Sequence, residues 1–114
     1  MTDSLPQNSG TGLDAKTKRR MRQIAHHLDP VVSIGDQGMR EGLIRETERA
    51  LTDHELIKVR INTPAREDRH ALGTELAVAC EAAVVQRIGK VIVLFRANPE
   101  ADPKLSNLAR FGQP

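Results

Sequence analysis

The sequence feature that most constrains the fold is the stretch from residue 31 to 51, VVSIGDQGMREGLIRETERAL, where a strand pattern changes into a helix pattern. The run VVSI is apolar and is bounded by Pro30 and Gly35, which is typical of a short buried strand. After Gly38, apolar or small residues recur on one side of a predicted helix: Met39, Leu43, Thr47, Ala50 and Leu51. A strand that leads directly into an amphipathic helix favours a layered α/β fold.

The same two patterns recur on either side of this stretch. Asp14 is a candidate N-cap of a first helix, whose apolar face comprises Met21, Ile24, Ala25 and Leu28 and which must end before Pro30. HELIKVRI, residues 54–61, alternates as a strand with one apolar and one basic face. A third helix is predicted from about Arg66 to Ala82, with an inward stripe of Leu72, Leu76, Ala79, Cys80 and Ala83.

Two strands, VVQRI and VIVLFR, flank a tight turn at Gly89 and Lys90. The predicted order is therefore helix, strand, helix, strand, helix, strand, strand: an α/β domain with helices packed on a four-stranded mixed sheet. Gly42 lies inside the second helix, where glycine costs roughly 1 kcal/mol relative to alanine, so close packing or a close ligand is expected there.

With 114 residues the chain is long enough for one domain, which we place at residues 13–97. Residues 1–12 are predicted to be a disordered tail and residues 98–114 a flexible one, because neither has a sustained apolar period. The single cysteine, Cys80, cannot form an intramolecular disulfide, which fits a reducing compartment. The sequence also has no signal-peptide pattern and no membrane span, so we predict a cytoplasmic protein.

The loop Gly35, Asp36, Gln37, Gly38 is the first candidate site. Backbone N–H groups there would lie beside the positive end of the second helix, where anions bind, and glycines leave room for a phosphate-ribose backbone. A turn whose φ values require glycine explains the spacing equally well. The loop lacks the Gly-Lys-Ser/Thr of a Walker loop, and the third glycine is misplaced for a dinucleotide fingerprint. The remaining mechanism for such a loop is the clamping of a nucleic-acid backbone, as in KH modules. In KH modules, however, the loop joins two helices, whereas here it follows a strand.

A basic cluster in the first helix is the second candidate site. Five basic residues and one acidic residue lie between Asp14 and Leu28, whereas the whole chain has a net charge of +2. A merely solvated face usually mixes both signs, so binding of an anion is favoured. Further basic residues could extend this predicted surface, although each alone is better explained as an ordinary surface residue. The cluster is Lys16, Lys18, Arg19, Arg20 and Arg22, and the additions are Arg40, Lys58 and Arg60.

Metal binding and catalysis have little support in the residues. The histidines His26, His27, His54 and His70 have no zinc-ligand spacing, and adjacent histidines on a helix diverge. Cys80 lies on an inward stripe, which would make its thiol inert. We therefore expect no metal, no cofactor and no enzymatic activity.

The motifs together, HHLDPVVSIGDQGMREGLIRETERALTDHELIKVRI followed by VVQRIGKVIVLFR, resemble the YhbY-type CRM family, the chloroplast RNA splicing and ribosome maturation domain. The resemblance covers roughly residues 13–97 and implies an RNA-binding domain with three helices and four strands. Stand-alone bacterial members are associated with precursors of the large ribosomal subunit. The resemblance implies RNA contacts by the loop from Gly35 to Gly38, with the basic residues as further contacts.

We therefore predict that the protein is a monomer that binds structured ribosomal RNA during assembly of the large subunit. It would recognise the backbone and the shape of the RNA. Near absence of aromatic residues agrees with this, because base stacking would require them. Asp36 departs from the family pattern, because it places a carboxylate in the predicted phosphate-binding loop. Alternatively, this carboxylate caps the second helix. Two alternatives stay open: a protein-interaction module of a ribosome or RNA-processing complex, and, less favoured, an enzyme acting on a phosphorylated small molecule.

Overall fold

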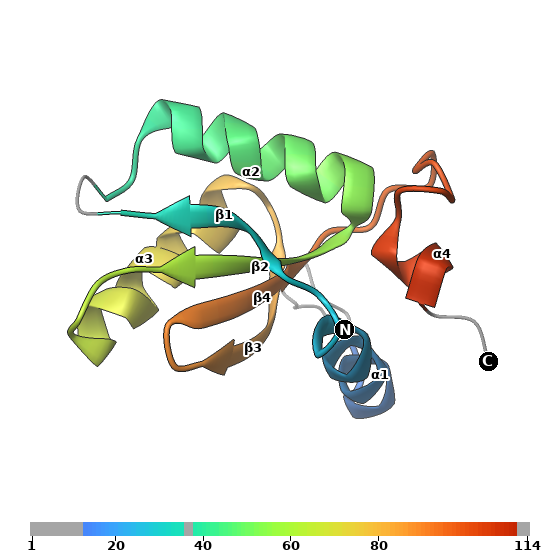
Figure 1. The fold of residues 1–114 in the computed structure, drawn as a ribbon, viewed down its shortest axis with the longest axis horizontal. Helices are drawn as coiled ribbons and strands as arrows, with labels where there is room; N and C mark the ends of the chain where they lie inside the picture. Colours follow the sequence, from blue (N-terminus) through green and yellow to red (C-terminus); the bar gives the residue numbers. More distant parts are fainter. Residues whose placement is uncertain (1–12, 36–37, 112–114) are drawn as a thin grey trace, which may run out of the picture.

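The computed structural model describes residues 13–35 and 38–111, which fold around one four-stranded sheet (Figure 1). The predicted order of three helices and four strands is confirmed, and a short fourth helix follows it. The helices are α1 (Ala15–Ala25), α2 (Glu41–His54), α3 (Arg66–Ala79) and α4 (Asn107–Phe111), and the strands are β1 (Pro30–Ile34), β2 (Leu56–Ile61), β3 (Ala83–Ile88) and β4 (Val91–Phe95).

The sheet is mixed, as predicted, with the strand order β1-β2-β4-β3. β1 and β2 are parallel because α2 carries the chain back to the start of β2, whereas β4 is antiparallel to both β2 and β3. Consequently β1 and β2 end at the same edge of the sheet as the turn between β3 and β4.

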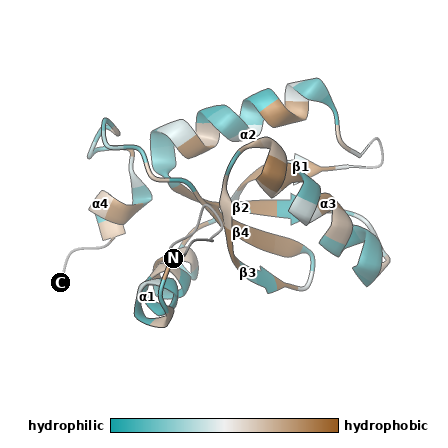
Figure 2. Cartoon of the chain, turned by 180° about the vertical axis from the view of Figure 1, so that it is seen from behind, coloured by the Kyte–Doolittle hydropathy of each residue, from teal (hydrophilic) through white to brown (hydrophobic). Residues whose placement is uncertain are grey.

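Helices cover both faces of the sheet and create two cores. The first core lies beneath α2 and α3, where Leu43, Leu51 and Leu76 pack on Val59 and its neighbours. The second core lies beneath α1, where Met21 and Ile24 pack on Leu56, Val85 and Val93. Figure 2 shows the corresponding pattern, with hydrophobic strands inside and hydrophilic outer surfaces on the helices. None of the helices within residues 13–35 and 38–111 is long and apolar enough to cross a membrane.

The first helix begins as its sequence predicts. The Asp14 carboxylate accepts a hydrogen bond of 2.7 Å from the Thr17 backbone N–H, so Asp14 is the N-cap. This hydrogen bond lowers the pKa of Asp14, because it stabilises the ionised carboxylate.

α3 begins at Arg66, as predicted, whereas the start of α2 and the end of α3 differ from the sequence expectation. α2 begins at Glu41, although Met39 still packs against the first core, and α3 ends at Ala79 because Glu81 takes a left-handed φ of 53°. Ala79 is exposed rather than part of the inward stripe. The close packing expected at Gly42 is also absent, since a Cβ there would come no nearer than 3.9 Å to Arg45 Nη2.

The prediction of a flexible tail after residue 97 disagrees with the structure as far as residue 111. The Glu55 carboxylate accepts hydrogen bonds of 2.7 Å from both the Asn98 N–H and the Ser106 hydroxyl. Asn107 is buried, and its side-chain amide donates to the Leu56 carbonyl at 2.7 Å. These contacts join residues more than 40 positions apart, so no local period in the sequence signals them.

Candidate nucleic-acid interface

The glycine loop follows the end of β1. Gly35 comes directly after the strand, and the Gly38 N–H donates a hydrogen bond of 3.0 Å to the Gly35 carbonyl, closing a turn. That N–H is therefore occupied inside the loop rather than directed at a ligand. Asp36 and Gln37, which complete the predicted site, lie outside the described residues.

The two glycines of the loop differ in whether the backbone requires them. Gly38 has a φ of +68°, a left-handed conformation that favours glycine, so the turn itself explains this residue. Gly35 has no such requirement: a Cβ built there meets nothing within 4 Å, and the residue is exposed. The open space beside Gly35 is available for a molecule that approaches the backbone closely.

The start of α2 lies just beyond the loop. Its N-cap residue is Arg40, which is exposed and forms no side-chain hydrogen bond to the first turn. The sequence also offers Asp36 as a cap of this helix, and Asp36 lies outside the described residues. The positive end of the helix dipole thus lies next to a cationic side chain, an arrangement that favours an anion nearby.

Two backbone hydrogen bonds place the glycine loop beside two other turns. The Asn62 N–H donates to the Ile34 carbonyl at 2.9 Å, and the Ile61 N–H donates to the Lys90 carbonyl at 2.7 Å. The loop after β1, the turn after β2 and the β3–β4 turn therefore form one continuous edge of the domain. This edge lies at the left of Figure 1.

Lys58 and Arg60 lie on the face of the sheet that also carries Leu56 and the second core. Arg60 is exposed and lies opposite Ser33 on β1 and Val91 on β4, one residue from the end of its strand. Lys58 is half-buried and lies closer to α1. The structure thus places Arg60 near the edge with the glycine loop and Lys58 further from it.

The basic cluster of α1 lies at the other end of the sheet. α1 packs on Leu56, the first residue of β2, and Figure 1 shows it on the side away from the glycine loop. The structure therefore does not join this cluster to the loop. Three cluster residues are exposed and two flank the buried face: Lys16, Arg19 and Arg20 are exposed, and Lys18 and Arg22 are half-buried.

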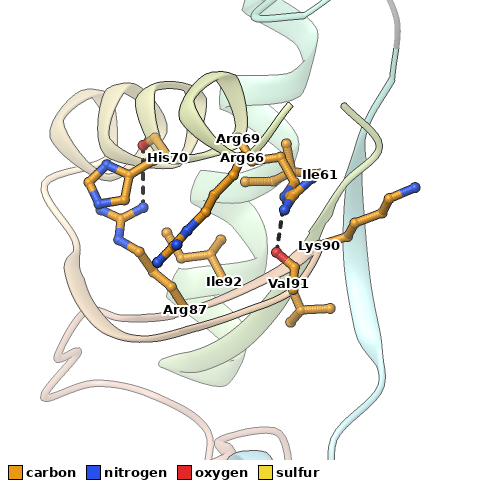
Figure 3. A pocket seen from close by; sticks show the side chains of 9 residues that line it. Ile61, Arg66, Arg69, His70, Arg87, Lys90, Val91 and Ile92 are labelled. Carbon is orange, nitrogen blue, oxygen red and sulfur yellow. Dashed lines mark hydrogen bonds between the residues drawn. The ribbon is translucent and has the colours of Figure 1, made fainter. Parts of the chain in front are cut away.

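A basic pocket, which the sequence patterns do not predict, opens on the same edge as the glycine loop (Figure 3). It has a volume of about 320 Å³ and lies between the first turns of α3 and the β3–β4 turn. Its cationic residues come from three separate segments, so no single motif reveals them. They are Arg66, Arg69, Arg87 and Lys90.

The described residues 13–35 and 38–111 contain no group of three or more side chains that could hold a metal ion. Cys80, the single cysteine, is fully buried beneath α2, and burial raises the pKa of its thiol to about 11. A neutral, inaccessible thiol is a poor nucleophile, which agrees with the inert cysteine predicted from the sequence.

Comparison with known proteins extends these observations. A protein of Pseudomonas aeruginosa named as a probable RNA-binding protein is 43% identical over 99 residues, spanning 87% of this chain and 95% of its own length. An RNA-binding protein of Haemophilus influenzae is 41% identical over 95 residues, or 83% and 96% of the two chains. These names describe RNA binding and no enzymatic activity.

The fold is similar to a known solution structure. A Staphylococcus aureus protein, described there as a proposed RNA-binding protein, superimposes with a TM-score of 0.70 and 36% sequence identity, covering 79% of this chain and 94% of its own. Residues 13–96 match the CRS1/YhbY (CRM) domain. With that match over most of its length, and with relatives of this identity and coverage, the chain belongs to the CRS1/YhbY (CRM) domain family.

Proposed function

We propose that the protein binds structured ribosomal RNA of the large-subunit precursor and assists assembly of that subunit, as a cytoplasmic monomer without enzymatic activity. The glycine loop, Arg40 and Arg60 form the main contact, and Lys58 with the α1 cluster forms a second. The RNA-binding names of relatives above 40% identity support an RNA ligand.

The observation that carries this proposal is the open space beside Gly35. Neither its backbone conformation nor a packed neighbour within the described residues demands a glycine there. A side chain at this position would, however, keep a phosphate-ribose backbone away from the loop and from Arg40. Close approach of an RNA backbone to Gly35 would therefore account for a glycine that the fold itself does not demand.

Recognition of the RNA backbone also agrees with the aromatic content. Phe95 and Phe111 are the two aromatic residues, and Phe95 packs against the second core. Phe111 lies on α4, next to α1, and so at the end of the sheet away from the glycine loop. Apart from the His70 ring in the basic pocket, the loop edge thus offers guanidinium and ammonium groups to phosphates rather than rings to bases.

Gly35→Ala tests the proposal. We expect the variant to fold normally and to bind a fragment of large-subunit ribosomal RNA about tenfold more weakly, the equivalent of one charge-assisted hydrogen bond of roughly 1.5 kcal/mol. Binding is measured by fluorescence anisotropy, and stability by urea denaturation.

Gly42→Ala is the matched control. Gly42 is exposed on α2, and a Cβ at this position would meet nothing closer than 3.9 Å, so alanine should stabilise the helix by about 0.5–1 kcal/mol, which calibrates the effect on stability of replacing a glycine. Equal affinity of Gly35→Ala and wild type would contradict the proposal. Wild-type protein that purifies free of RNA, judged by its absorbance ratio, would then favour a protein-interaction module.

A further inference from the structure

The basic pocket on the loop edge contains positive charge that no carboxylate neutralises within the described residues. Arg69 donates from Nε to the Gly89 carbonyl at 3.1 Å and from Nη1 to the Thr63 and Pro64 carbonyls at 3.0 and 2.6 Å. These partners are neutral backbone oxygens. They fix the guanidinium between the turn after β2 and the β3–β4 turn without cancelling its charge.

Arg87 is held in the same way on the opposite side of the pocket. Its Nη2 donates to the Thr74 hydroxyl at 2.8 Å and its Nη1 to the His70 carbonyl at 3.3 Å, as Figure 3 shows for His70. Partial burial lowers the pKa of Arg87, because desolvation disfavours its charged form. A nearby anion would offset that cost.

Gly73, in the interior of α3, makes room for this arrangement. A Cβ at that position would lie 3.1 Å from Arg87 Nη1 and 2.8 Å from Ile92 Cδ1. Glycine inside a helix costs roughly 1 kcal/mol relative to alanine. That cost is explained by the close approach of Ile92 on the sheet, and then of the Arg87 guanidinium, to the helix backbone.

The rim of the pocket carries two further cations, Arg66 and Lys90. Both are exposed, and neither side chain forms a hydrogen bond or ion pair within residues 13–35 and 38–111. In Figure 3 the Lys90 side chain extends away from Arg87, at the outer side of the pocket. The acidic residues Glu67 and Asp68 of the same α3 turn are exposed and do not line it.

The floor of the pocket is apolar, with Ile61, Val91 and Ile92 between the cations. A volume of about 320 Å³ is at the lower end of the range of ligand sites, roughly 300–1,000 Å³, and suits a ligand of about one nucleotide. Planar guanidinium groups bind phosphate through two parallel hydrogen bonds and stack on bases.

We propose that this pocket binds the phosphate group of a single unpaired nucleotide of the RNA, with the nucleotide resting on the apolar floor. The inference rests on the proposed RNA-binding function. It adds a second contact on the same edge as the glycine loop, so that one strand of RNA can pass from Gly35 across the β3–β4 turn.

The test compares two double variants that each remove two positive charges. Arg66→Gln with Lys90→Gln alters the pocket rim, whereas Arg49→Gln with Lys104→Gln alters residues outside the pocket. For the pocket variant we expect an affinity for the large-subunit ribosomal RNA fragment that is at least tenfold lower. The slope of log K against the logarithm of the salt concentration should become shallower by about one to two. The control should lose less than twofold. Equal losses of RNA affinity in the two variants would overturn the proposal that the pocket binds RNA.

Adenosine monophosphate is the second probe, followed by the amide NMR signals of Gly89 and Lys90. Weak, saturable shifts that disappear in the pocket variant support phosphate binding, even if wild type fails to bind RNA and the proposed function falls. The absence of shifts, together with normal RNA binding by the pocket variant, overturns the inference alone. Binding of the free nucleotide tighter than that of RNA would overturn the assignment to RNA.

Discussion

At the scale of single residues, the two glycines of the loop show how one motif can combine two requirements. The φ of +68° at Gly38 is a property of the turn, whereas the open space beside Gly35 has no explanation inside the domain. The sequence predicts both residues as a pair and leaves open which of them serves the fold. Only the backbone geometry separates them, because a φ value cannot be read from residue spacing.

Cys80 gives a prediction that depends on pH. Burial raises its pKa from 9.0 to about 11, so iodoacetamide should alkylate the native protein at pH 8 far more slowly than the urea-unfolded protein. Because the unfolded thiol ionises first, stability should be unaffected below about pH 9 and should fall as pH rises toward 11. Cys80→Ala, measured by urea denaturation, should lack this component of the alkaline loss. Equal alkylation rates for folded and unfolded protein would contradict the burial.

Asp36 gives a prediction from charge. Its carboxylate belongs to the proposed phosphate-binding loop, and like charges a few Å apart repel by about 1 kcal/mol in water and more where water is excluded. Asp36→Lys should therefore bind ribosomal RNA at least fivefold more tightly at about 0.1 M salt, measured by anisotropy. Asp53→Lys, on the last turn of α2, makes the same change of charge and should have little effect. Equal gains in both variants would indicate a nonspecific effect of net charge.

At the scale of elements, the C-terminal segment is anchored more firmly than its proline-rich sequence indicates. Asn107→Ala should destabilise the domain by about 1–3 kcal/mol, because the buried Leu56 carbonyl would lose its 2.7 Å hydrogen bond. Urea denaturation measures the loss, with Lys104→Ala as an exposed control in the same segment. A loss below about 0.5 kcal/mol would mean that water replaces the amide.

The same segment explains where prediction from sequence stops. The helices and strands before residue 97 follow from apolar periods of about 3.6 and 2, which their packing on one sheet confirms. Asn98, Ser106 and Asn107 are held instead by polar contacts with Glu55 and Leu56, which leave no periodic trace. The sequence patterns do not predict Arg69 and Arg87 as site residues for a related reason. Their hydrogen-bond partners are backbone carbonyls and one hydroxyl, which no motif in the sequence indicates.

At the scale of the whole molecule, positive charge is divided between the two ends of the sheet. The sequence predicts the α1 cluster and the glycine loop as one surface, but in the structure they lie apart. They should therefore contribute independently to RNA binding. We expect Lys18, Arg19 and Arg20 changed to Ala, and Arg40 with Arg60 changed to Ala, to weaken binding by free energies that add within about 0.5 kcal/mol. Each set should also reduce the salt dependence of log K by about 0.7–0.9 for every phosphate that the variant no longer neutralises.

Titrations of the two sets and their combination, between about 50 and 200 mM salt, measure both quantities. A combined loss well below the sum would show that the RNA engages one end at a time. A salt-independent affinity in the wild type would contradict an electrostatic interface altogether.

The described ends of the chain both belong to the second core, where Leu13 and Leu108 pack near α1, far from Gly35. A fluorophore attached at Phe111 would therefore lie at the end of the sheet away from the glycine loop, beside Arg20 of the α1 cluster. Immobilised or labelled protein can thus report RNA binding without an attachment that blocks the loop edge. The same geometry would allow a second domain to be fused at the C-terminal side with both proposed contacts of that edge left accessible.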